Sequence, residues 1–167
     1  MRGQDQPTAP LADATGFRFA VIVSRFNETV TGNLRSAATA ALQDAGASLV
    51  EVLPVPGAFE IPQAARAAAE SGRFDAIVCL GCIIRGETPH FEYIASAVAY
   101  GITDAAGDTG VPMAFGVLTT DTVEQAAARS GPGPDNKGRE AAAAAIEMAV
   151  LYRELSTAAN RPSGFRV

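Results

Sequence analysis

The chain's single histidine, His90, ends a segment that reads RGETPH from Arg85. Histidine is the side chain best suited to pass protons near neutral pH. Gly86 lets a ligand approach the backbone closely, and the free N–H groups at the start of the helix that we expect after Thr88 favour an anion. The segment therefore indicates proton transfer beside a phosphate site, although a lone histidine and a capping threonine also fit purely structural roles.

Two further segments carry side chains suited to a ligand. The sequence PGAFE, from Pro56, opens a predicted helix. Glu60 in that segment can accept hydrogen bonds from hydroxyl groups, but a carboxylate at a helix start also complements the helix dipole. Phe26 follows the first predicted strand, where its ring can stack on a planar ligand or pack into the core. At both positions the sequence leaves the functional and the structural interpretation open.

Alternating strand and helix patterns separate these segments. Short apolar runs predict strands, and apolar residues at helical spacing predict helices. Thr88 suits a helix N-cap and Pro89 the first helical position, while Asp121–Glu124 has the pattern of a capping box. The predicted strands are Phe17–Ser24, Ser48–Val55, Ala76–Cys82 and Met113–Leu118. The predicted helices are Glu28–Ala45, Phe59–Ser71, one that opens at Thr88-Pro89, Asp121–Ser130 and Asn136–Thr157.

Strands that alternate with helices imply right-handed crossovers and a parallel sheet covered on both faces. We expect an α/β three-layer sandwich whose four strands follow the flavodoxin-like order 2-1-3-4. Residues 1–16 read as an arm that can pair with a neighbouring subunit, residues 17–157 as the domain and residues 158–167 as a tail. Ligands of such sheets bind beyond the carboxyl ends of the strands. This rule directs the search to residues 25–27, 56–60, 83–90 and 119–121.

Cys79 and Cys82 form a C-x-x-C spacing, which redox proteins use at a helix start. Here both cysteines belong to the third predicted strand and its end. A spacing of three places two side chains on opposite faces of a strand. A zinc site would need more ligands than one histidine and one cysteine pair provide. We therefore predict structural cysteines and no metal site.

The composition restricts the partners. The formal net charge of −5 argues against nonspecific binding to nucleic acid or to an acidic membrane, and no run approaches the roughly 18 apolar residues of a membrane span. The N-terminal segment lacks the apolar core of a secretory signal, so we expect a cytoplasmic protein. Only 19% of the residues are charged and the mean hydropathy is +0.13, which suggests that copies of the chain bury surface against each other. The first candidate for such an interface is the predicted helix Asn136–Thr157. The alternative is that the alanine content alone raises the hydropathy.

The connection Gly131–Gly138 reads GPGPDNKG and superficially resembles a P-loop. It fails in detail because Asn136 replaces the glycine before the lysine, Gly138 replaces the Ser or Thr, and a helix rather than a strand precedes it. We therefore exclude a nucleoside triphosphatase. Arg129 and Lys137 remain as cations for a ligand, which a neighbouring chain can also supply.

Together these segments resemble the lumazine synthase family. The most specific match is the thirteen-residue run GCIIRGETPHFEY, Gly81–Tyr93. The matching segments follow one another in the family's order and extend from about residue 17 to about residue 150. Besides the long run they are Ser24–Asn27, Val55–Pro62, Phe115–Thr120, Glu124–Ala126, Arg129 and Asn136–Gly138.

The resemblance implies a reaction. Members of this family condense 5-amino-6-(D-ribitylamino)uracil with 3,4-dihydroxy-2-butanone 4-phosphate to give 6,7-dimethyl-8-ribityllumazine, phosphate and water, the penultimate step of riboflavin biosynthesis. The steps need proton transfers but no redox chemistry, so the resemblance implies neither a metal nor an organic cofactor. The expected ligands are the two small-molecule substrates and inorganic phosphate.

The resemblance also implies roles by motif position. His90 is the expected proton-transfer residue, and Arg129 is the expected phosphate clamp, since a guanidinium suits a bidentate contact. Gly86, Glu87 and Thr88 are expected to contact the same phosphate-bearing substrate. The residues expected to bind the pyrimidine ring or the ribityl chain are Phe26, which stacks on the ring, Asn27, Ala58, Phe59, Glu60, Cys82, Ile83, Ile84, Phe115 and Lys137.

In the family, Phe115 and Arg129 come from the adjacent subunit of a pentamer, and twelve pentamers often close into an icosahedral shell. The short connection Gly131–Asp135 leads us to expect the 60-subunit shell, with riboflavin synthase as a candidate partner. Three other classes compete: a lumazine- or flavin-binding protein without turnover, a structural shell protein, and a flavodoxin-like electron carrier. The first two leave His90 and Arg129 without a use, and the third needs a phosphate loop where this chain has Arg25–Glu28.

Overall fold

The computed structural model describes residues 10–159. Four strands form one parallel sheet in the order β2-β1-β3-β4, which confirms the predicted order 2-1-3-4. The strands are β1 (Arg18–Ser24), β2 (Leu49–Val55), β3 (Ala76–Ile84) and β4 (Met113–Thr120). The helices are α1 (Glu28–Asp44), the 3-10 turn η1 (Ala58–Glu60), α2 (Ile61–Glu70), α3 (His90–Thr109), α4 (Val123–Ser130) and α5 (Lys137–Ala159).

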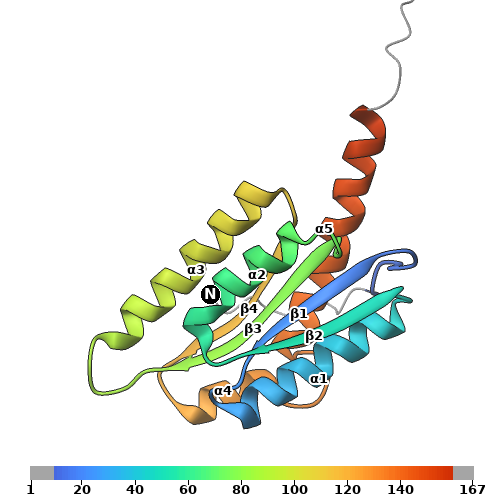
Figure 1. Cartoon of the computed structure of the whole chain (residues 1–167). Coiled ribbons are helices and arrows are strands. Elements are labelled where there is room, and N and C mark those ends of the chain that lie inside the picture. The colour runs from blue at the N-terminus through green and yellow to red at the C-terminus, as the bar shows by residue number, and fades with distance from the viewer. Residues whose placement is uncertain (1–9, 160–167) are drawn as a thin grey trace, which may run out of the picture.

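Helices cover both faces of the sheet, so the molecule has the three predicted layers (Figure 1). On one face, α2 and α3 pack on a cluster that includes the fully buried Ile22 and Ile61. On the other face, α1, α4 and α5 pack on a cluster that includes Leu34 and Ile146. β1 and β3 contribute to both clusters, which explains why their sequences are continuous apolar runs. Burial of this apolar surface is the main force that holds the layers together.

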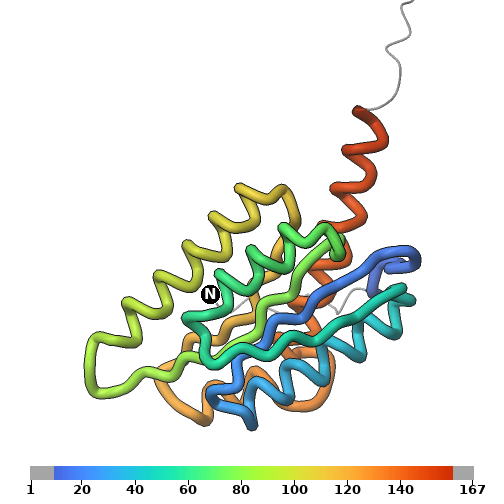
Figure 2. The backbone as a smooth tube through the Cα atoms, viewed as in Figure 1, coloured from blue at the N-terminus to red at the C-terminus, as the bar shows by residue number. Residues whose placement is uncertain are grey.

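The carboxyl ends of the strands lie at one edge of the sheet, and α1, α3 and α4 begin there, as the backbone path in Figure 2 shows. β3 and β4 are each two residues longer than predicted, because Ile83 pairs with Thr119 and Ile84 pairs with Thr120. The two isoleucines therefore lie on the strand, beyond the end that we predicted for it. Threonine is β-branched and fits a strand, so the ladder continues past the apolar run.

The prediction that Thr88 caps α3 is wrong. The helix begins at His90, its N-cap is Pro89, and no side chain makes the cap hydrogen bond. Pro89 has no N–H to leave unpaired and therefore tolerates the position before the helix as well as its first turn. The capping box of α4 forms one residue later than predicted: Thr122 Oγ1 accepts a hydrogen bond from Gln125 N at 3.2 Å.

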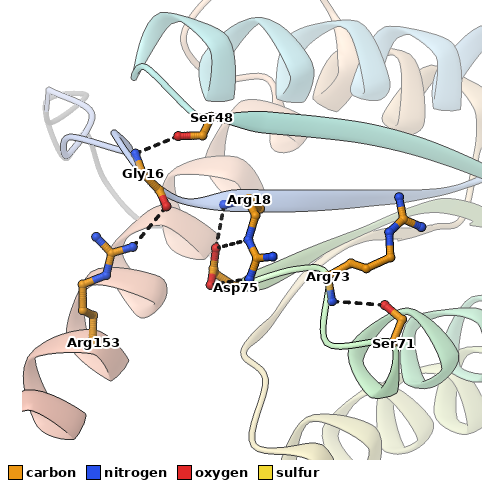
Figure 3. Close-up of polar contacts among 7 residues, drawn as sticks. All are labelled: Gly16, Arg18, Ser48, Ser71, Arg73, Asp75 and Arg153. Atoms are coloured by element: carbon orange, nitrogen blue, oxygen red, sulfur yellow. Dashed lines mark hydrogen bonds and ion pairs between the residues drawn. The ribbon is translucent and has the colours of Figure 1, made fainter.

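At the opposite edge of the sheet, polar contacts tie distant segments together (Figure 3). Gly16 N donates to Ser48 Oγ at 2.9 Å, and the guanidinium of Arg153 in α5 donates to Gly16 O at 3.3 Å. Arg18 at the start of β1 forms an ion pair with Asp75, with Nε and Oδ2 3.2 Å apart. These contacts lie at the amino ends of the strands and therefore support the fold away from the edge where ligands are expected.

The described N-terminal residues pack on their own chain. Ala14 is fully buried, and its N–H donates to Ala45 O at 2.8 Å. The division into an arm of residues 1–16, a domain of residues 17–157 and a tail of residues 158–167 stays a prediction, as does the pairing of the arm with a neighbouring subunit. Residues 1–9 and 160–167 lie outside the described part. None of the described helices is long and apolar enough to span a membrane.

Candidate functional site

A cavity of about 490 Å³ lies at the carboxyl ends of β1 and β3, and we call it the β1/β3 cavity. The loop after β1, the turn η1, the end of β3 and the start of α3 supply its walls. The predicted site residues that line it are Phe26, Asn27, Ala58, Phe59, Glu60, Cys82, Ile83, Ile84, Gly86, Thr88 and His90. Gly57, Phe91, Ile94 and Val123 also line it, and the sequence analysis assigned them no role.

Two aromatic rings lie exposed at this cavity. Phe26 is 70% exposed and Phe59 is 54% exposed, although large apolar side chains are usually buried. The ring of Phe26 is not part of either apolar core cluster, so the structure does not support the core-packing alternative for this residue. Exposed rings that line a cavity offer flat surfaces on which a planar heterocycle can stack.

Asn27 joins the loop after β1 to the end of β3. It is the only described residue other than glycine with a positive φ, at 60°, in the left-handed region that asparagine tolerates better than most residues. Its side-chain Nδ2 donates to Cys82 O at 2.9 Å, and its own carbonyl accepts from Val30 N at 3.0 Å at the start of α1. Asn27 thereby holds two walls of the cavity at a set separation.

Glu60 lines the cavity, with its carboxylate close to the glycine that precedes η1. A Cβ atom at Gly57 would lie 3.2 Å from Glu60 Oε2, closer than most such contacts.

His90 is the first residue of α3 and lines the cavity with Thr88. Residues 85–90 are all exposed, so the imidazole is open to substrate and solvent. Glu87, in the same loop, is exposed but lines neither of the two cavities described here. The loop therefore brings Gly86, Thr88 and His90 to the cavity and leaves Glu87 outside it.

The remaining predicted residues lie in a second cavity of about 420 Å³, which we call the β4/α5 cavity. Phe115 lies on the edge strand β4 and is 48% exposed. Arg129 in α4 donates from Nη1 to Gln125 O at 2.9 Å, and Lys137 Nζ lies 2.7 Å from both carboxylate oxygens of Glu140. The other residues that line this cavity are Gly116, Val117, Leu118, Thr119, Glu140, Ala141 and Ala144.

Asn136 determines how α4 connects to α5. Its Nδ2 donates to Ser130 O at 2.9 Å and to Gly131 O at 3.0 Å, while its Oδ1 accepts from Gly138 N at 2.8 Å. The side chain is buried, with every donor and acceptor engaged, and it satisfies free backbone groups of both helices. It thus holds Arg129 and Lys137 on the same cavity, a role that the sequence analysis did not assign.

The cysteines occupy opposite faces of β3, as the spacing predicted. Cys79 belongs to the cluster under α2 and α3, and Cys82 to the cluster under α1 and α5. Both are free thiols, and burial raises the pKa of Cys79 to about 12 and that of Cys82 to about 11. Over residues 10–159, no group of three or more His, Cys, Asp or Glu side chains is placed to hold a metal ion.

Comparison with known proteins decides the family. A family model described as 6,7-dimethyl-8-ribityllumazine synthase matches residues 16–153. The chain belongs to the lumazine synthase family. This confirms the resemblance that rested on the run Gly81–Tyr93 and its companion segments.

Two lumazine synthases illustrate the relationship. The protein of Syntrophus aciditrophicus (strain SB) is 51% identical over 144 residues, which cover 85% of this chain and 94% of the relative. The protein of Salinibacter ruber (strain DSM 13855 / M31) is 54% identical over 142 residues, which cover 84% and 91%. Among solved structures, a GDP-L-fucose synthetase from Naegleria fowleri aligns with a TM-score of 0.42 and 12% identity. The alignment covers 95% of this chain and 51% of that one, and a likeness this weak says nothing about the function of this chain.

Proposed function

We propose that this chain forms 6,7-dimethyl-8-ribityllumazine from 5-amino-6-(D-ribitylamino)uracil and 3,4-dihydroxy-2-butanone 4-phosphate, at sites that two neighbouring copies build together. Membership of the lumazine synthase family supports the reaction. The observation that carries the location is the gathering of most of the predicted residues around the β1/β3 cavity, although they come from three separate segments of the chain.

The β1/β3 cavity takes the pyrimidine. Phe26 stacks on the ring, Phe59 and Ala58 line the pocket, and Glu60 accepts hydrogen bonds from the ribityl hydroxyls. The backbone of Cys82–Ile84 holds the edge of the pyrimidine, together with Asn27. Cys82 O already accepts one hydrogen bond from Asn27, which leaves this carbonyl one further lone pair for a substrate N–H.

The phosphate-bearing substrate lies toward the start of α3. Gly86 and Thr88 line the cavity there, and the first N–H groups of α3 favour an anion. His90 passes the protons that carbonyl condensation, phosphate elimination and ring closure require. Glu87, although it lies outside the cavity of the single chain, belongs to the same substrate loop and approaches the phosphate-bearing substrate in the complex.

Arg129, Lys137 and Phe115 complete the site from the next copy. They line the β4/α5 cavity of their own chain and not the cavity that contains His90. A phosphate clamp and a proton-transfer group that serve one substrate must lie close together, so two copies must place these two cavities against each other. Much of the rate enhancement then comes from holding two substrates in contact, which explains why assembly precedes activity.

We propose a homopentamer as the smallest active form and the 60-subunit shell as the assembly that the short Gly131–Asp135 connection favours. Exposed apolar side chains on α5, including Met148, Leu151 and Leu155, are consistent with burial between copies. Sedimentation of the purified chain at neutral pH and high concentration tests whether the shell forms. If the largest species is a pentamer, the shell is excluded. A riboflavin synthase partner and a cytoplasmic location remain predictions from the sequence.

The experiment that tests the reaction mixes purified, folded protein with both substrates and follows the absorbance and fluorescence of the lumazine product. Product formation above the spontaneous background supports the proposal. Tight pyrimidine binding without any acceleration, from a folded and assembled sample, contradicts it and favours a binding protein without turnover.

A further inference from the structure

Arg85 forms the polar link between the sheet and the start of α3. Its backbone N–H donates to Thr120 O at 2.8 Å and so continues the β3–β4 ladder. Its side chain reaches two carboxylates: Nε lies 2.7 Å from Asp121 Oδ1, and Nη1 lies 3.2 Å from Glu92 Oε1 in the first turn of α3. The guanidinium also lies over the ring of Phe91, 4.5 Å from its centroid.

The start of α3 has little other support. The loop of residues 86–89 is exposed, and the first buried side chain of the helix is Val98, two turns after His90. Between them only Phe91, Ile94 and Ala95 are partly buried against the core cluster. Since His90 is the first residue of this lightly packed helix end, its position depends on whatever holds the first turn.

Arg85 is not placed to bind the substrate itself. It lines neither the β1/β3 cavity nor the β4/α5 cavity. Its carboxylate partners approach two different edges of the guanidinium, and the hydrogen bonds that Arg85 donates to Asp121 and to Glu92 raise its pKa above the ordinary value. The same contacts offset two negative charges beside a site that must accept a phosphate.

We propose that Arg85 is a positioning residue that holds His90 in its catalytic place by bridging Asp121, at the carboxyl end of β4, to Glu92 in α3. The inference rests on the proposed function, because it requires His90 to transfer protons. A planar guanidinium reaches both carboxylates in set directions and stacks on Phe91 at once, whereas the compact ammonium of a lysine does not reproduce this geometry.

The test compares Arg85→Gln and Arg85→Lys with Arg18→Gln as the matched control. Arg18 and Arg85 are 44% and 45% exposed and both pair with a carboxylate, but Arg18–Asp75 lies at the opposite edge of the sheet. We expect both Arg85 variants to lower kcat roughly 10-fold with little change in the KM of the pyrimidine, since misplacing a catalytic group slows turnover. We expect Arg18→Gln to keep the wild-type kcat, although its Tm should fall about as much as that of Arg85→Gln. An unchanged kcat in Arg85→Gln overturns the proposal.

A double-mutant cycle separates positioning from direct action. If Arg85 works through His90, then Arg85→Gln costs no further rate once His90→Ala has removed the imidazole. A full additional loss in the His90→Ala background means that Arg85 acts on the substrate independently, and it overturns the proposal.

A readout without turnover keeps this inference apart from the proposed function. His90 is the only histidine, so protein without an affinity tag, labelled with ¹⁵N-histidine, gives the imidazole signals of one residue. Magic-angle-spinning NMR records them at any assembly size. We expect Arg85→Gln to shift or broaden these signals and Arg18→Gln to leave them unchanged. Unchanged signals in Arg85→Gln refute the positioning role, whereas failure of wild-type protein to accelerate the reaction refutes the proposed function itself.

Discussion

At the scale of single residues, the proposed proton-transfer residue and the proposed phosphate clamp lie in different cavities. His90 lines the β1/β3 cavity, and Arg129 lines the β4/α5 cavity. Each residue is exposed, so either can be truncated without opening a hole in the core. Their substitution should therefore change kinetics more than stability, and it should change different kinetic constants.

His90→Ala should lower kcat, by roughly 10²-fold, with pyrimidine binding largely retained, because in the proposed site the ring stacks on Phe26 and not on the imidazole. Arg129→Ala should instead raise the KM of the phosphate-bearing substrate, on the order of 10- to 100-fold, because a charge-assisted clamp is lost. Steady-state kinetics with each substrate varied in turn measures both effects. Loss of pyrimidine binding in His90→Ala, or an unchanged KM in Arg129→Ala, would mean that the assigned role is wrong.

The two thiols should be inert in the folded protein. Burial raises their pKa values to about 12 for Cys79 and about 11 for Cys82, so neither forms a thiolate at pH 8. Ellman's reagent should titrate both only after denaturation. Because the unfolded thiols ionise near pH 9, the unfolded state loses protons first, and the stabilisation present below pH 9 should be lost between about pH 9 and pH 12. Fast labelling of the native protein would contradict the buried positions.

At the scale of elements, α5 packs very close to α1 at Gly138. A Cβ atom at Gly138 would overlap the backbone of Leu34, with Leu34 Cα 2.8 Å away. Gly138 follows Lys137, which lines the β4/α5 cavity, and Asn136, which caps the helix. The close helix contact, the cap and the cavity wall therefore depend on the same three residues.

Gly138→Ala should destabilise the protein by about 3 kcal/mol, because the added methyl group meets backbone that cannot turn away. Gly107→Ala is the matched control: Gly107 lies in α3, is exposed, and would place its Cβ in open space. In this control alanine should stabilise the helix by about 0.5–1 kcal/mol. Urea unfolding of both variants measures the difference. Equal stability in the two would show that α1 and α5 separate easily.

At the scale of the whole molecule, one chain places the proposed site residues in two separate cavities, which the proposed function treats as two halves of a shared site. Phe115 lies on the edge strand β4, is 48% exposed, and lines the β4/α5 cavity but not the cavity that contains His90. Closed cyclic assemblies use such complementary surfaces, since the same patch pair repeats at every interface.

Mixed assemblies test this arrangement. Subunits with His90→Ala and subunits with Arg129→Ala should each be weakly active alone and should recover activity when they are co-assembled. With random mixing of equal amounts, about a quarter of the interfaces pair an intact His90 with an intact Arg129. Assays of the co-expressed and the separately assembled variants, at equal total protein, measure the recovery. No recovery would place both residues in a site within one chain.

Some features follow from local sequence alone. The parallel sheet, its two covered faces and the opposite faces of Cys79 and Cys82 follow from periodicity and from the geometry of parallel strands. The residues of the β1/β3 cavity were also predictable, because the carboxyl ends of parallel strands meet at one edge whatever the side chains are. The family follows from the run Gly81–Tyr93, whose length leaves little room for coincidence.

Other features required the folded chain, because they depend on which distant atoms meet. α3 begins at His90 and not after Thr88, and Arg85 bridges Asp121 and Glu92 across three segments. The separation of Phe115, Arg129 and Lys137 into a second cavity arises because β4 is an edge strand, and its neighbours in space are α4 and α5. A sequence pattern records the faces of each element, but only packing decides which faces meet and therefore which residues share a cavity.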